Sequence, residues 1–143
     1  MTEEVPEFPK PLAPAHPPFS PRWIGRRGPR RTPCVLDAGD VRFGVGGRTA
    51  IALALRRLDI GPGAKVLAPA YHCTAMIEPI VAAGAEPVFY RVREDTSVDL
   101  EDAAAKADGA ARALLAVHYF GWPQDGGALR AFCDARGWAL LED

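Results

Sequence analysis

Lysine is scarce in this chain, and so are cysteine, net charge and long apolar runs. Lys10, Lys65 and Lys106 are the only lysines, although lysine and arginine together number 17 among 143 residues. The net charge of −1 gives no general attraction to nucleic acid or to an anionic membrane. No apolar run approaches the roughly 20 residues of a membrane span. We therefore expect neither a membrane protein nor a typical nucleic-acid-binding protein.

The cysteines are too few and too scattered for a cross-linked or metal-bound scaffold. There are three of them, Cys34, Cys73 and Cys133, and none forms a CxxC pair. An odd number without close spacing predicts neither a disulfide framework nor a metal site. The N-terminus also lacks the apolar stretch of a secretory signal. A reduced, cytoplasmic protein is the expectation.

Residues 1–33 differ in composition from the rest of the chain. They hold nine of the 14 prolines, which excludes a regular helix or a central strand and predicts an irregular arm. Residues 21–31 are basic and carry one tryptophan, Trp23. A nucleic-acid- or phosphate-binding arm is one interpretation. We favour a solvated tail, because a single aromatic residue accompanies the charges.

Residues 34–143 are expected to form an α/β fold with a mostly parallel sheet. From residue 41 onward, helix-type and strand-type patterns alternate with short connections, as in parallel sheets flanked by helices. The run ALLAV has no polar face, as expected for a strand covered on both sides. Asp99 is a candidate N-cap. Helices are predicted over 49–58, 74–83, 99–107 and 127–136, and strands over 65–68, 87–92, 113–117 and 138–141.

A glycine-rich turn precedes the first predicted helix, in the sequence FGVGGRT. Glycines, unpaired N–H groups and a hydroxyl at a helix N-terminus can bind a phosphate. A dinucleotide-binding loop would require the G-x-G-x-x-G spacing after a clear strand, with an acid ending the next strand. Here the spacing is G-x-G-G and Asp59 follows a helix. A turn without any ligand is the third interpretation, and the turn alone does not decide among them.

Three further stretches follow strands, where open α/β sheets bind ligands. His72 and Cys73 are potentially reactive, but adjacent residues diverge, and half-buried packing is the commoner outcome. His118 is a candidate general base, although we favour a histidine that orders its loop. Glu142 and Asp143 follow the last strand, and a carboxylate at the end of a central strand usually faces a ligand.

Four ordered stretches between Gly46 and Asp143 carry a family resemblance. They read GRTAIALALRRLDIGPGAKVLAPAY, IVAAGAEPVFYRV, LLAVHYFGWPQD and RGWALLED. In this order they resemble the DegT/StrS group of sugar aminotransferases, which use pyridoxal 5'-phosphate (PLP) within the fold type I superfamily. The resemblance implies that residues 34–143 are the N-terminal part of the PLP-binding large domain.

The resemblance also implies roles for individual residues. Gly47, Arg48 and Thr49 match the small-residue turn that holds the PLP phosphate, although the family usually has glycine or alanine where Arg48 stands. Asp143 matches the aspartate that pairs with the pyridine nitrogen and keeps it protonated.

The residue expected against the cofactor ring is less clear. The family usually carries a stacking aromatic at the position of Cys73. His72 is the first alternative for that role, and Tyr71 is a weaker one.

The implied activity is transfer of an amino group from an amino acid, such as glutamate, to a nucleotide-linked keto-sugar, by a homodimer when complete. The family's Schiff-base lysine lies downstream of the aspartate, so we expect a fragment that lacks it and is inactive alone. Lys10, Lys65 and Lys106 are not expected to replace it.

Two alternatives remain. One is a fold type I enzyme of other specificity, or a PLP-free relative, suggested by Cys73. The other is a non-catalytic α/β binding protein with a basic arm.

Overall fold

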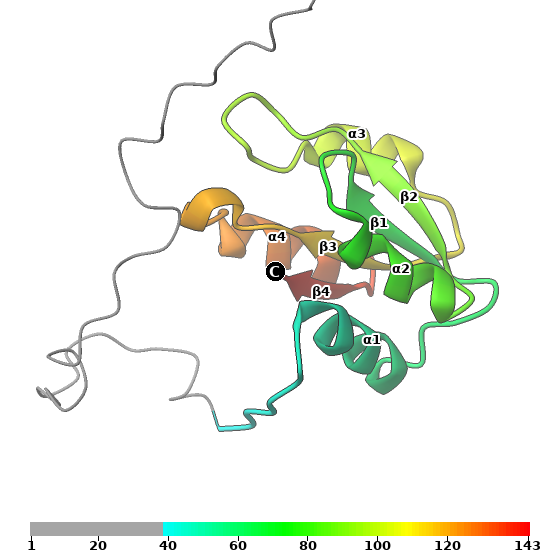
Figure 1. The fold of residues 1–143 in the computed structure, drawn as a ribbon. Helices are drawn as coiled ribbons and strands as arrows, with labels where there is room; N and C mark the ends of the chain where they lie inside the picture. Colours follow the sequence, from blue (N-terminus) through cyan, green and yellow to red (C-terminus); the bar gives the residue numbers. More distant parts are fainter. Residues whose placement is uncertain (1–38) are drawn as a thin grey trace, which may run out of the picture. The chain divides into compact units, whose positions relative to one another are not determined.

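The computed structural model describes residues 39–143, and the expected irregular arm over 1–33 lies outside them. Residues Arg42–Asp143 form one compact unit. The helices and strands considered below belong to it (Figure 1). Within the described residues, no helix is long and apolar enough to cross a membrane.

Four parallel strands form one sheet in the order β2-β1-β3-β4. The predicted α/β fold with a parallel sheet is therefore confirmed. The elements are α1 (Gly47–Arg57), β1 (Lys65–Pro69), α2 (Thr74–Ala82), β2 (Glu86–Tyr90), α3 (Leu100–Lys106), β3 (Ala111–Ala116), the 3-10 helix η3 (Tyr119–Gly121), α4 (Gly126–Asp134) and β4 (Ala139–Glu142).

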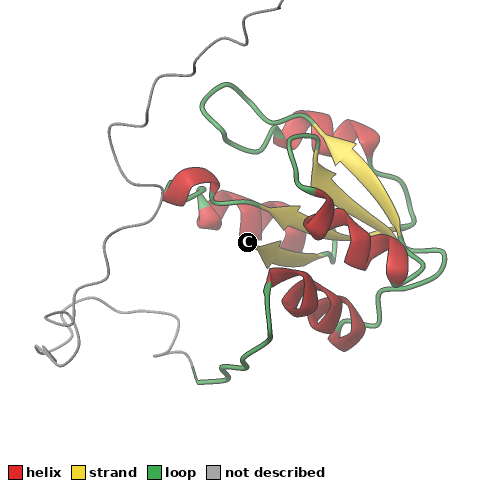
Figure 2. Cartoon of the chain, viewed as in Figure 1, coloured by secondary structure: helices red, strands yellow, loops and turns green. Residues whose placement is uncertain are grey.

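Helices cover both faces of the sheet (Figure 2). Alternate side chains of a strand point to opposite faces, so each of β1 and β3 contributes to two cores. Val66 and Leu115 join the core beneath α1 and α2, whereas Leu67 and Leu114 join the core beneath α3 and α4. All four are essentially inaccessible to solvent. This two-sided burial explains why the run ALLAV has no polar residue.

The direction of winding changes between β1 and β3. From β1 the chain runs through α2 to β2 on one side, whereas β2 connects through α3 across β1 to β3, and α4 leads on to β4. The loops that leave the carboxyl ends of β1 and β3 therefore diverge toward opposite faces of the sheet. Such a switch point is where open α/β sheets bind ligands.

Several predicted bounds are corrected by the structure. Helix α1 begins at Gly47 and ends at Arg57, so Leu58 is exposed instead of sharing the buried face of Ile51 and Leu55. Helix α2 begins at Thr74, as predicted, includes Pro79 in its interior and ends one residue early, at Ala82.

Strand β2 is shorter than predicted and ends at Tyr90. The N–H of the next residue, Arg91, donates to the Asp102 side chain at 2.7 Å. The chain therefore leaves the sheet after Tyr90. Val92 instead forms an isolated antiparallel bridge with Val98.

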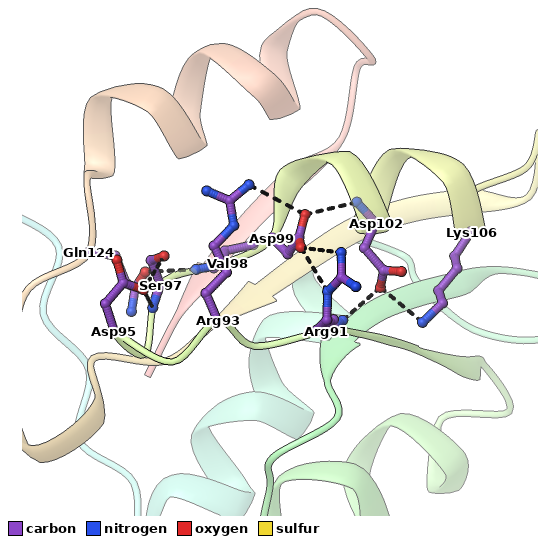
Figure 3. Close-up of polar contacts among 9 residues, drawn as sticks. All are labelled: Arg91, Arg93, Asp95, Ser97, Val98, Asp99, Asp102, Lys106 and Gln124. Atoms are coloured by element: carbon purple, nitrogen blue, oxygen red, sulfur yellow. Dashed lines mark hydrogen bonds and ion pairs between the residues drawn. The ribbon is translucent and has the colours of Figure 1, made fainter.

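Asp99 fixes the connection between β2 and α3 (Figure 3). The residue is only 3% exposed. It accepts a hydrogen bond from the Asp102 N–H at 3.1 Å, which confirms the predicted N-cap. The Arg91 guanidinium also donates to it, at 2.7 and 2.9 Å. The backbone hydrogen bond from Asp102, followed by the pairing with Arg91, lowers the pKa of Asp99 from 3.8 to about 2.

This carboxylate should make the stability of the chain depend on acid pH. A group with a lowered pKa in the folded state stabilises the fold above its unfolded pKa and loses that contribution as pH falls through the folded value. Asp99→Asn keeps an acceptor for the Asp102 N–H but loses the charge that faces Arg91. We expect a lower melting temperature at neutral pH, with a deficit that shrinks as pH falls from 3.8 toward about 2.

Calorimetry across this pH range tests the expectation. Asp134→Asn, which changes an exposed aspartate of α4, is the matched control. A deficit for Asp99→Asn that stays constant down to pH 2 would contradict the role of the charge.

Candidate active site

The N-terminus of α1 and the end of β4 meet at the carboxyl edge of the sheet (Figure 1). A Cβ atom placed on Gly47 would lie 4.0 Å from Oδ1 of Asp143, although 95 residues separate the two positions in the sequence. Gly46 is the N-cap of α1 and provides no side-chain hydrogen bond. The first N–H groups of α1 therefore lack a side-chain cap, and they lie beside a carboxylate. Asp143 and the glycine turn therefore lie side by side at this edge.

The backbone of Asp143 is held by the strand next to it. Its N–H donates to the carbonyl of Ala116 at 2.9 Å, and its carbonyl accepts from the N–H of His118 at 2.7 Å. These bonds extend the pairing of β3 and β4 by one residue beyond the strands. These bonds use only the backbone of Asp143. The residue is exposed, so the side-chain carboxylate remains available to a ligand.

His118 orders the loop that follows β3, as we favoured from the sequence. Its Nδ1 accepts a hydrogen bond from the Gln124 N–H at 3.0 Å. Its Nε2 lies 3.3 Å from Oε1 of Glu142. Both ring nitrogens are therefore engaged within the protein, which argues against a general base that acts on a substrate.

The loops after β1 and β3 are joined across the switch point. The Tyr119 hydroxyl donates a hydrogen bond to the carbonyl of Tyr71, and the two rings lie 5.3 Å apart. Burial raises the pKa of the Tyr119 phenol to about 12, with the neighbouring Tyr71 adding to the effect. Through Tyr119 and His118, the loop that carries His72 and Cys73 is linked to Asp143.

Two residues predicted to face the cofactor ring occupy different surroundings. The His72 ring stacks on Phe89, with centroids 4.7 Å apart and planes 8° from parallel, and its Nδ1 lies 2.8 Å from the Pro69 carbonyl. Cys73 is the exposed N-cap of α2. His72 already has an aromatic partner, whereas Cys73 has an open face. Which of them contacts a ring stays a prediction.

The Arg48 side chain forms an ion pair at the surface and does not face Asp143. Its Nε lies 2.9 Å from Oε2 of Glu78, and the pair links α1 to α2 at the surface. The surface pair contributes little stability, but it occupies the guanidinium.

The lysines of the described region lie away from Asp143. Lys65 begins β1, at the opposite edge of the sheet, and its Nζ is 2.8 Å from Asp108. Lys106 donates to the Phe89 carbonyl and lies 2.9 Å from Asp102. Lys10 lies outside the described residues. The expectation that Lys65 and Lys106 do not serve as the Schiff-base lysine agrees with these positions.

Phe120 and Trp122, which follow β3, were not among the site residues predicted from the sequence. Phe120 has a left-handed backbone with φ of 57°, unusual for a bulky residue. Phe120 and Trp122 are 80% and 71% exposed. A non-glycine residue with positive φ at the end of a central strand often marks a functional loop. The aromatic residues of HYFGW were the signal in the sequence, but their exposure could not be read from it.

A family comparison decides the relationship. The model of the DegT/DnrJ/EryC1/StrS aminotransferase family matches residues 45–143, which is most of the chain and all of the sheet. The chain belongs to this family.

Individual relatives agree with this assignment. A dTDP-4-dehydro-2,3,6-trideoxy-D-glucose 4-aminotransferase from Saccharopolyspora spinosa is 34% identical over 134 residues, covering 87% of this chain and 34% of the relative. The crystal structure of Streptomyces venezuelae DesV in complex with a ketimine intermediate has a TM-score of 0.64 and 38% identity, covering 67% of this chain and 26% of that one.

An aminotransferase from Psychrobacter cryohalolentis has a TM-score of 0.65 and 35% identity, covering 68% of this chain and 25% of that one. The chain thus spans about a third or less of the length of the relatives it matches.

Removing the Tyr119 hydroxyl should loosen the loop after β1. Tyr119→Phe deletes the hydrogen bond to the Tyr71 carbonyl, and such a bond contributes about 0.5–1.5 kcal/mol. We expect amide hydrogen exchange over residues 71–73 to accelerate by roughly up to tenfold through local opening. Exchange in α4 should not change, and it serves as the internal control. Unaltered exchange over 71–73 would show that the loop is held by other contacts.

Proposed function

We propose that this chain is part of a PLP-dependent aminotransferase that moves an amino group from an amino acid to a nucleotide-linked keto-sugar. The observation that carries the proposal is the Asp143 carboxylate beside the uncapped N-terminus of α1, in a chain that belongs to the aminotransferase family. Relatives named as aminotransferases of nucleotide-linked sugars support the substrate class. A cytoplasmic homodimer remains our expectation for the complete protein.

The residues at this edge fit the cofactor. Gly46 and Gly47 leave open the space in which side chains would crowd an anion; a Cβ on Gly46 would meet nothing within 4 Å. The N–H groups at the start of α1 and the helix dipole would hold the phosphate, and the Thr49 hydroxyl would donate one more hydrogen bond. Arg48 would contribute its backbone N–H, because its side chain pairs with Glu78.

Asp143 would bind the ring at its nitrogen. PLP supplies the electron sink for amino transfer when it is bound, provided that the ring nitrogen keeps its proton. The Asp143 carboxylate would hold that proton, and the backbone bonds to Ala116 and His118 fix the position from which it does so. Cys73 or His72 would contact one face of the ring and restrict its orientation.

A covalent lysine is required to complete such a site, and neither lysine of the described region lies near Asp143. By analogy with the family, we expect that lysine downstream of the aspartate and outside the described residues. Borohydride treatment of the whole encoded protein with PLP should label that lysine in a one-to-one ratio. The 143-residue chain alone should be labelled only weakly. Stoichiometric labelling of Lys65 or Lys106 would overturn this assignment.

The same preparation distinguishes the alternatives. A nucleotide-linked keto-sugar that accepts nitrogen from glutamate supports the proposed reaction. Bound PLP without this transfer indicates a fold type I enzyme of other specificity. A whole protein that takes up no PLP indicates a PLP-free binding protein.

The Thr49 hydroxyl should contribute to cofactor affinity. A hydrogen bond to a charged group contributes roughly 1.5–3 kcal/mol, so Thr49→Val should weaken PLP binding about 10- to 100-fold. Thr49→Ser keeps a hydroxyl and should retain most of the affinity. Titration of the apo form of the whole protein, followed by cofactor fluorescence, measures both variants. Equal affinity for the valine variant and the wild type would mean that the turn is purely structural.

Asp143→Asn should separate binding from turnover. The asparagine occupies the same volume, so PLP should remain bound, but a neutral amide cannot hold the ring proton. We expect kcat to fall by roughly 10- to 100-fold, equivalent to the loss of one charged hydrogen bond. Asp134→Asn on α4 is the matched control. Wild-type turnover in the Asp143 variant would remove this residue from the mechanism.

A further inference from the structure

Gln124 joins three backbone groups of two segments near the candidate active site. Its Nε2 donates to the carbonyl of Thr96 at 2.9 Å and to that of Val117 at 3.0 Å. Its Oε1 accepts from the N–H of Val98 at 3.2 Å, a contact drawn in Figure 3. One amide thus connects the loop between β2 and α3 to the end of β3. Because both ends of the amide are used, its orientation is fixed.

The backbone of the same residue determines the state of His118. A backbone N–H can only donate, so the bond from Gln124 to Nδ1 requires that nitrogen to accept. The proton of the neutral ring must then lie on Nε2, which faces Oε1 of Glu142 at 3.3 Å. Gln124 therefore selects the tautomer that can donate to Glu142.

His118 in turn holds Asp143 from two directions. Its backbone N–H donates to the Asp143 carbonyl at 2.7 Å, and its ring contacts the side chain of Glu142, the preceding residue. Within the described residues, the hydrogen bonds that fix the Asp143 backbone come from β3 and this loop. A shift of the His118 loop would therefore move the carboxylate relative to Gly47.

We propose that Gln124 is a positioning residue that sets the place of the Asp143 carboxylate: its side chain fixes the His118 loop, and its backbone N–H selects the Nε2–H tautomer of the ring. The role rests on the proposed function, because it concerns the carboxylate assigned to the PLP nitrogen. Gln124 touches neither cofactor nor substrate in this assignment.

The first test uses the whole encoded protein with bound PLP. Gln124→Ala leaves two carbonyls and one N–H without their partner and should displace the loop. A small displacement of a reacting group can cost up to about 100-fold in rate. We expect kcat to fall about tenfold with a smaller change in KM, and the pH midpoint of the visible cofactor absorbance to move.

The matched control is Arg112→Ala. Arg112 also donates to two backbone carbonyls, those of Gly109 and Ala111, but it lies at the start of β3, on the opposite edge of the sheet. Its removal should leave kcat and the absorbance midpoint at wild-type values. If both variants lose activity with an unmoved midpoint, the effect is general destabilisation and the proposal is overturned.

Two substitutions of His118 provide a test that does not require a stable Gln124 variant. His118→Asn places an acceptor near the Nδ1 position and keeps the bond from Gln124, whereas His118→Gln places a donor near Nε2 and keeps only the contact with Glu142. We expect the asparagine variant to retain more kcat than the glutamine variant.

Equal activity of the two His118 variants would overturn the positioning role. The wild-type protein separates this outcome from failure of the proposed function. If the wild type binds PLP and transfers an amino group, the variants test Gln124 alone. If the wild type shows no cofactor absorbance at all, the proposed function fails and this role falls with it.

Discussion

The adjacency of β1 and β3 is the constraint on which the other features depend. Because the chain winds one way from β1 and the other way after β2, the loops at the carboxyl ends of these two strands separate. The separation leaves an edge that no helix of the described region has to cover. The hydrogen bond from Tyr119 to the Tyr71 carbonyl then spans that edge, and β4 delivers Asp143 beside it. The placement of the candidate site follows from strand order, and side-chain chemistry is added to it.

Much of this architecture could be predicted from the sequence, and the reason is physical. Burial on both faces requires apolar runs such as ALLAV, and glycine ends the helices, so element type and parallel class were readable. Asp99 was readable as a cap because its pattern is local. The order of strands was not readable, since it depends on contacts between distant segments. The end of β2 was misjudged because the Arg91 N–H donates to the Asp102 side chain and not to a neighbouring strand. The end of α1 was misjudged by one residue, because the helix ends at Arg57.

Two aspartates in the same small fold illustrate how environment separates structure from function. Asp99 is buried and surrounded by donors, with two arginines and a backbone N–H near its oxygens, so its charge is used in holding a loop. Asp143 is exposed, and its backbone takes part in the pairing with β3 while its carboxylate faces a glycine turn. The sequence alone gives both as acids near the ends of regular elements. The number of hydrogen-bond donors around each carboxylate shows that the Asp99 charge is already paired, whereas that of Asp143 is available to a ligand.

The arginine in the glycine turn fits the same distinction. A large cation in this turn would be disruptive if side chains at that position held the phosphate. In the proposed site the backbone at the start of α1 would hold the phosphate instead, and the Arg48 side chain extends to Glu78 on α2. Its volume therefore lies over the helix pair and leaves the neighbourhood of Gly47 and Asp143 open. A site formed by N–H groups and a helix dipole tolerates substitution of any side chain that can leave along the surface, so the departure at this position is compatible with phosphate binding.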